Sequence, residues 1–123
     1  MKVSLFLALM MAAFCLAQTA ETYRRDATEF ARQKSWDQAI ASYRKALEFE
    51  PNDAPTHYNL ALALKYKGEA KQAVDEFEVT LRLKPKWADA QYGLGAARYD
   101  LHDPAGSRTS RYRLRSADQP FPS

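Results

Sequence analysis

The sequence predicts an all-α protein in which stacked helical hairpins form a right-handed superhelix, a solenoid of about two and a half hairpins. Three observations lead to this prediction: residues 20–53 align with residues 54–87 at an offset of 34, apolar residues recur at helical spacing, and a proline ends each copy. The chain has 123 residues, of which 46% are hydrophobic and 27% charged. These values indicate one globular domain and exclude the collagen-like and disordered classes.

Residues 1–17 have the profile of a signal peptide. Lys2 supplies a positive charge, and apolar residues follow almost without a break up to Ala17. This run is shorter than the roughly 20 residues that a transmembrane helix needs, which favours a cleaved leader over a membrane anchor. We therefore expect cleavage after Ala17 and export to a periplasmic or secreted location. Cys15, the single cysteine, would be removed with the leader.

The repeat is defined by identical residues at one offset. Seven pairs are identical: Ala20 and Ala54, Thr22 and Thr56, Ala27 and Ala61, Gln38 and Gln72, Ala39 and Ala73, Leu47 and Leu81, and Pro51 and Pro85. Four further pairs keep apolar character: Phe30 and Leu64, Ile40 and Val74, Tyr43 and Phe77, and Phe49 and Leu83. Agreement of spacing and residue size over two complete copies predicts two similar structural units.

Each copy contains two helices separated by a short polar break. In the first copy, Tyr23, Ala27 and Ala31 lie on one face of the first helix, and a second helix follows from Trp36. The second copy has the same layout, with Gly68 as the expected C-cap of its first helix. A proline, which cannot continue the backbone hydrogen-bond ladder, follows the second helix of each copy.

Small residues should allow the two helices of a hairpin to pack closely. Ala27, Ala61 and Gly95 share one position of the repeat on the first helices, while Ala39 and Ala73 share another on the second helices. Residues of this size let helix axes approach to about 8 to 10 Å. No hairpin buries its apolar stripe alone, so we expect neighbouring hairpins to stack and to form one concave and one convex surface.

A third, partial copy is expected over residues 88–116. Its first helix is predicted at residues 88–101. Residues 104–115 follow an acceptable N-cap at Asp103 but lack an apolar stripe, so the sequence leaves open whether they form a second helix. The tail, residues 117–123, is expected to be disordered.

The repeat resembles that of tetratricopeptide repeat (TPR) proteins over about residues 20–101. The family pattern is W-x2-L-G-x2-Y, then A-x3-F, then P. The second copy matches it at Leu60, Ala61, Leu64, Ala73, Phe77 and Pro85, and the first at Tyr23, Ala27, Phe30, Ala39, Tyr43, Ala46 and Pro51. His57 stands where tryptophan is usual. Asp26 stands where the pattern has leucine, and we expect it to face solvent.

This resemblance implies that the first helix of each repeat lines a concave groove that binds a peptide segment of a partner protein. The groove-facing residues carried over are Arg24, Arg25, Thr28, Arg32, Tyr58, Asn59, Leu62, Lys65, Tyr66, Asp89, Tyr92, Ala96 and Tyr99. They predict a basic and aromatic surface, of residue types that anchor protein interfaces. The carboxylate-clamping set of some family members is matched only at Arg24 and Asn59.

The sequence has no motif that predicts catalysis, a metal site or a cofactor site. His57 falls at a helix-packing position and His102 in a turn, so neither is expected to act as a general base. The Gly93-x-Gly95 pair lies inside a predicted helix with no preceding strand, which disfavours a phosphate loop. We therefore predict a non-catalytic, exported scaffold without cofactor or metal.

Two alternatives to groove binding remain at this point. In the first, the C-terminal arginines contact nucleic acid or an anionic lipid; these are Arg108, Arg111, Arg113 and Arg115. A net charge of only +3 disfavours nucleic acid as the partner. In the second, the exposed end of the array stacks on another copy of the chain and makes a homo-oligomer.

Overall fold

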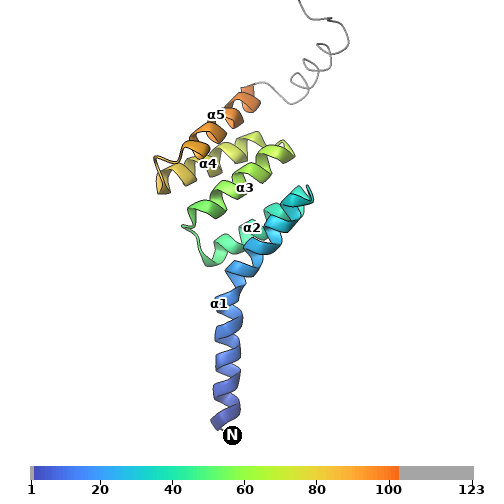
Figure 1. The fold of residues 1–123 in the computed structure, drawn as a ribbon, viewed down its shortest axis with the longest axis vertical. Helices are drawn as coiled ribbons and strands as arrows, with labels where there is room; N and C mark the ends of the chain where they lie inside the picture. The colour runs from blue at the N-terminus through green and yellow to red at the C-terminus, as the bar shows by residue number, and fades with distance from the viewer. Residues whose placement is uncertain (1, 103–123) are drawn as a thin grey trace, which may run out of the picture.

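The computed structural model describes the backbone of residues 2–102 and, within it, the side chains of residues 4–11 and 19–102. Over this range the chain forms five helices and no strand: α1 (Lys2–Arg32), α2 (Trp36–Phe49), α3 (Ala54–Lys67), α4 (Ala70–Leu83) and α5 (Ala88–His102). Figure 1 shows helices α2 to α5 stacked beside the C-terminal half of α1. The predicted all-α repeat solenoid is confirmed.

Consecutive helices pack as hairpins. Helix α1 pairs with α2 and α3 with α4, and the hairpins are joined by contacts of α2 with α3 and of α4 with α5. Ala27, Ala39, Ala61 and Ala73 have no exposed surface. The small residues predicted to allow close approach therefore lie in the helix interfaces of both complete hairpins. Each second helix ends two residues before the proline that follows it.

The core continues from hairpin to hairpin. Its large members are Ile40, Tyr43, Leu60, Leu64 and Phe77, all at most 5% exposed. Tyr43 and Phe77 are related by the repeat offset and fill corresponding spaces. Burial of one continuous apolar cluster is what makes the stacked repeats a single unit.

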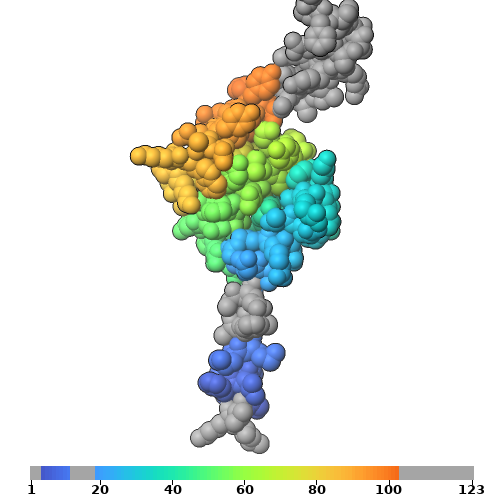
Figure 2. Space-filling model, in the orientation of Figure 1, coloured from blue at the N-terminus to red at the C-terminus, as the bar shows by residue number. Residues whose placement is uncertain are grey.

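Helix α1 is much longer than the other helices. It runs without interruption from Lys2, so the border expected after Ala17 lies inside a helix. Its N-terminal part extends away from the stacked helices (Figures 1 and 2), and apolar side chains there, such as Leu5, Phe6 and Met10, are more than half exposed. A search of the described residues finds no helix that is long and apolar enough to cross a membrane.

The first helices of both complete repeats end in the same left-handed turn. Gly68 has φ 99° and donates its N–H to the carbonyl oxygens of Leu64 and Lys65, which confirms the predicted C-cap. Lys34, at the same position of the first repeat, has φ 61°. A left-handed conformation is costly for a residue with a Cβ, so the first repeat holds strain that the second avoids.

His57 joins α3 to α4 and to the turn between α2 and α3. Its Nδ1 lies 2.6 Å from a carboxylate oxygen of Glu76 on α4, and its Nε2 lies 2.7 Å from the carbonyl oxygen of Pro51 in the α2–α3 turn. Both neighbours accept hydrogen bonds, so both contacts are satisfied together only when each ring nitrogen carries a hydrogen. Glu76 is therefore a partner in the packing of α4 on α3.

The third copy differs from the first two at its glycines. Gly95 was expected to pack closely, as Ala27 and Ala61 do, but it is exposed, and a Cβ added there would meet nothing within 4 Å. The glycine in close contact is Gly93, which is buried against the ring of Phe77.

The physical reason is that Ala27 and Ala61 are covered by the second helices of their own hairpins, whereas no described helix covers Gly95. Arg98, at the repeat position of Phe30 and Leu64, is exposed and pairs with Glu78 of α4 at 3.1 Å. The second helix considered for residues 104–115 and the tail at 117–123 lie outside the described residues.

Candidate functional site

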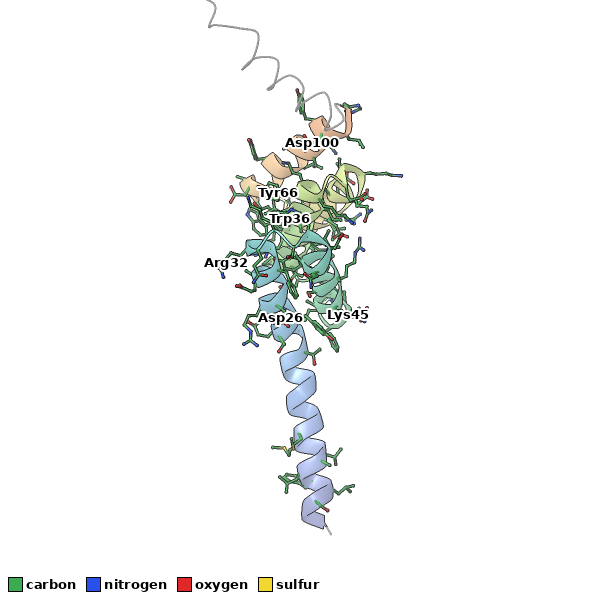
Figure 3. The ribbon with its side chains drawn as sticks, turned by 90° about the vertical axis from the view of Figure 1, so that its right-hand side faces the viewer. Asp26, Arg32, Trp36, Lys45, Tyr66 and Asp100 are labelled. Carbon is green, nitrogen blue, oxygen red and sulfur yellow. The ribbon has the colours of Figure 1, made fainter. Side chains whose placement is uncertain are left out.

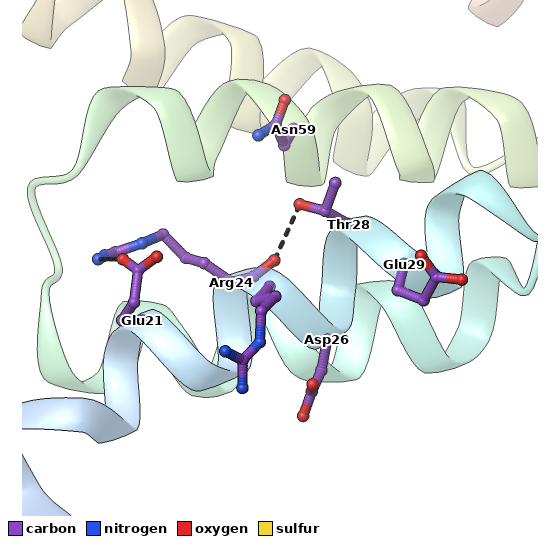
Figure 4. A pocket seen from close by; sticks show the side chains of 7 residues that line it. Glu21, Arg24, Asp26, Thr28, Glu29 and Asn59 are labelled. Carbon is purple, nitrogen blue, oxygen red and sulfur yellow. Dashed lines mark hydrogen bonds and ion pairs between the residues drawn. The ribbon is translucent and has the colours of Figure 1, made fainter.

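Helices α1 and α3, the first helices of the two complete repeats, border a cavity of about 680 Å³. Its lining residues are Glu21, Arg24, Arg25, Asp26, Thr28, Glu29 and Asn59. Figure 4 shows Asn59 on α3 facing Thr28 on α1. Four of the residues predicted for the groove, Arg24, Arg25, Thr28 and Asn59, are thus brought together in one place.

Arg24 is held at one side of this cavity by carboxylates. It donates to Glu21 at 2.7 Å and to Glu50 in the α2–α3 turn, and its Nη1 lies 3.9 Å from Asp53. Hydrogen bonds from Glu21 and Glu50 raise the pKa of Arg24 above its ordinary value. Arg24 therefore anchors the start of the first repeat to the following turn and is already neutralised there.

Arg25 and Asp26 supply the uncompensated charges of the cavity. Neither side chain has an ion-pair partner within the described part of the chain, and both are exposed. The exposure of Asp26 agrees with the expectation that it faces solvent. Thr28 donates its hydroxyl hydrogen to the carbonyl oxygen of Arg24 at 2.9 Å, while the side-chain amide of Asn59 makes no hydrogen bond to another side chain in the described part of the protein.

A second group of predicted groove residues gathers around an aromatic pair. The rings of Tyr66 and Trp36 are stacked with centroids 5.3 Å apart, and Lys65 Nζ lies 5.2 Å from the centroid of Tyr66. Lys65 also pairs with Asp100 of α5 at 3.7 Å, and both side chains are less than one fifth exposed. Trp36, Tyr66 and Asp100 lie along one side of the stacked helices in Figure 3.

Tyr58 and Leu62 are used mainly for packing. The ring of Tyr58 lies 4.7 Å from that of Trp87 and 5.9 Å from that of Phe77, measured between centroids. Burial, with a smaller contribution from the charge of Asp89, raises the pKa of Tyr58. Leu62 is partly buried against the core. The two residues therefore support the surface more than they offer free groups to a partner.

Of the remaining predicted residues, Ala96 is half-buried and the others, Arg32, Asp89, Tyr92 and Tyr99, are exposed. Arg32 pairs with Glu29 at 2.7 Å, a contact that lowers the pKa of the Glu29 carboxyl group. Tyr92 is 81% exposed and Tyr99 is 49% exposed. The predicted set is thus divided into the α1–α3 cavity, the Trp36–Tyr66 pair and the tyrosines of α5.

The surface is less basic than the sequence suggested. Of the four predicted cations, only Arg25 lacks a carboxylate partner among the described residues. Sequence reasoning missed the partners Glu50 and Asp100, since they are brought in by helix packing. Glu21 and Glu29 were missed as well, although they lie three residues from Arg24 and Arg32 on the same helix, a spacing that could have revealed these pairs.

Among the described side chains, residues 4–11 and 19–102, no group of three or more His, Cys, Asp or Glu is arranged to hold a metal ion. The contacts of His57 and Glu76 are accounted for by the packing of α3 on α4.

Comparison with known proteins gives a consistent picture. A family model described as TPR repeat matches residues 28–68. The chain is 31% identical over 68 residues to a peroxisomal targeting signal receptor of Candida albicans, covering 55% of this chain and 12% of the receptor. It is 30% identical over 76 residues to the heat-shock protein cognate co-chaperone sgt12 of Aspergillus fumigatus, covering 62% of this chain and 22% of that protein.

A third relative is the mouse protein O-mannosyl-transferase TMTC1, 32% identical over 66 residues, which are 54% of this chain and 7% of the transferase. The chain therefore spans less than a quarter of the length of each of these relatives.

Proposed function

Because the chain contains a TPR repeat and folds as an all-α helical repeat solenoid, we propose that it is a non-catalytic interaction module that binds a peptide segment of a partner protein. The cavity between α1 and α3 is the single observation that carries this proposal. It lies between the first helices of consecutive repeats, and four of the residues expected to line a peptide groove border it.

The chemistry of the cavity suits an extended backbone. Asn59 offers an amide with both donors and an acceptor, which is the combination that pairs with a peptide group. Arg25 offers five donors and a large contact area, a property of residues that dominate interface energies. Two of the relatives are named as a targeting signal receptor and as a co-chaperone, and these names support a function in binding other proteins.

We also propose that the module is exported. The support is the apolar run that follows Lys2 and ends at Ala17, together with the exposure of Leu5, Phe6 and Met10 in the described structure. A leader that is removed leaves no such apolar surface on the mature protein. Mass spectrometry of the N-terminus after expression with an export pathway would show whether the chain begins at Gln18.

Selection from a library of random short peptides tests the binding function directly. The full chain is immobilised, enriched peptides are synthesised, and their affinities are measured by fluorescence anisotropy. Arg25→Ala and Asn59→Ala should each weaken binding by about tenfold, the cost of losing one well-placed polar anchor at an interface. Tyr92→Ala tests whether the bound segment reaches α5.

A matched control comes from the outer helices. Lys71 on α4 is exposed and has no ion-pair partner among the described residues, so Lys71→Ala should leave peptide affinity unchanged. All variants should keep the helical circular dichroism of the parent, because the changed side chains are outside the core. Enrichment of peptides whose affinity is unaffected by both Arg25→Ala and Asn59→Ala would show that the α1–α3 cavity is not the binding site.

A further inference from the structure

The cations of the predicted groove are occupied by carboxylates of the chain itself. Arg24 bonds to both Glu21 and Glu50, while Lys65 pairs with Asp100 from the neighbouring helix. The Lys65 and Asp100 side chains are 17% and 19% exposed, so their attraction is less screened than that of a surface pair. An incoming carboxylate at either cation has to displace a partner that is already in place.

Such displacement is unfavourable for an acidic ligand. The displaced Glu or Asp remains covalently close and repels the ligand's negative charge, and the exchange of one carboxylate for another gains no net ion pair. Arg32 follows the same rule, because Glu29 lies beside it. The groove therefore contains the cationic residue types of a basic surface, but carboxylates of the chain itself neutralise the charges of Arg24, Arg32 and Lys65.

Two uncompensated charges of opposite sign remain in the α1–α3 cavity. Arg25 and Asp26 are adjacent in sequence, both border the cavity, and neither has an ion-pair partner in the described structure. In Figure 4 the Asp26 carboxylate extends from α1 on the side away from Asn59. A ligand complementary to this pair carries one negative and one positive group.

We propose, on the basis of the peptide-binding function above, that the groove selects segments carrying both an acidic and a basic side chain and discriminates against purely acidic segments. Purely acidic segments are disfavoured because Arg24 and Lys65 are already neutralised. Segments with both charges are favoured because Arg25 and Asp26 are free to pair with an acidic and a basic side chain, and Asn59 is available to the peptide backbone.

The peptides obtained by selection test the first half of this proposal. Among peptides whose binding depends on Arg25, those with both an acidic and a basic residue should predominate, and Asp26→Asn should shift the enriched set toward peptides that are acidic only. A set that is acidic only for the parent chain overturns the charge selection, even though dependence on Arg25 would still support peptide binding. A set with no dependence on Arg25 or Asn59 overturns both proposals.

A defined acidic probe tests the discrimination without any selected peptide. A fluorescein-labelled peptide of alternating Glu and Ala is titrated against the full chain and against a variant carrying Glu21→Gln, Glu50→Gln and Asp100→Asn. Releasing Arg24 and Lys65 should tighten binding of this probe by at least about tenfold and make it more sensitive to salt.

The control variant for the acidic probe is Glu48→Gln, which removes one negative charge where the triple variant removes three, and which lies on α2, paired with Lys45. It should leave the affinity for the probe close to that of the parent. A parent chain that binds the probe as tightly as the triple variant contradicts the proposal. Circular dichroism of each variant shows that the comparison is made between folded proteins.

Discussion

The ring of Phe77 on α4 lies against the backbone of Gly93 on α5, so closely that a Cβ added at Gly93 would be 2.5 Å from Cε1 of the ring. Phe77 has no exposed surface and belongs to the continuous core. The absence of a side chain at Gly93 is therefore what lets α5 pack on the second repeat.

Substituting this glycine should destabilise the protein. Gly93→Ala forces the Phe77 ring or helix α5 to move, at a cost of about 1–3 kcal/mol of unfolding free energy, as for other overpacked cores. Gly95→Ala is the matched control, since open space surrounds that position, and it should stabilise the helix by about 0.5–1 kcal/mol. Urea unfolding followed by circular dichroism gives both values. Equal effects of the two variants would contradict the assigned contact.

Lys34 provides a second test of backbone geometry. It adopts φ 61° at the position where the second repeat has Gly68 at φ 99°. Lys34→Gly should raise the free energy of unfolding by roughly 0.5–1 kcal/mol, because glycine reaches this conformation without a Cβ clash. The reciprocal change Gly68→Ala should lower it by a similar amount. Thermal unfolding of the two variants beside the parent checks both signs.

His57 is expected to contribute to stability through its two hydrogen bonds. His57→Ala leaves the Glu76 carboxylate and the Pro51 carbonyl oxygen without this partner, and should cost about 1–3 kcal/mol. His102, which is exposed, serves as control: His102→Ala should change stability by less than about 0.5 kcal/mol. Chemical denaturation measures the difference. If the two substitutions were equivalent, the His57 contacts would have no energetic weight.

Tyr58 should make the fold sensitive to alkaline conditions. Burial raises its pKa in the folded state above its ordinary value of 10.0, so the folded protein keeps a proton that the unfolded chain loses. Unfolding free energy consequently falls as the pH rises through and above that value. Tyr58→Phe, which has no hydroxyl to ionise, should reduce the fall, whereas Tyr92→Phe, at an exposed position, should not. The measurement is the midpoint of urea unfolding of the parent and the two variants at several pH values from about 8 to about 11, a range that brackets the ordinary tyrosine pKa.

The fold was predictable from sequence because its main determinants recur at a fixed offset. Ala27 and Ala61, with Ala39 and Ala73, specify where helices approach, and the structure buries all four completely. Gly68 was also predicted correctly as a C-cap. The close packing predicted for Gly95 from the repeat offset was wrong, because burial at that position depends on a covering helix and not on the residue itself.

The charges of the candidate site were less predictable. The positions of Arg24 and Lys65 followed from the repeat, but their state depends on Glu50 and Asp100, which are distant in sequence and are brought close only by the packing of neighbouring helices. Pairs three residues apart on one helix, such as Arg32 and Glu29, need only helical geometry and can be found without a structure.

Helix α1 runs through Ala17 without a break, so the first turn of the first hairpin depends on residues that the proposed export would remove. In an α-helix each N–H bonds to the carbonyl four residues earlier, so the amides of residues 18–21 are satisfied by carbonyls of residues 14–17. Cutting the chain after Ala17 turns the first of these nitrogens into an α-amino group and leaves the other three amides at a bare helix end, beside buried Ala20. A processed protein would have to rebuild that first turn from its own side chains or from water, with Thr19 as the nearest hydroxyl able to cap it.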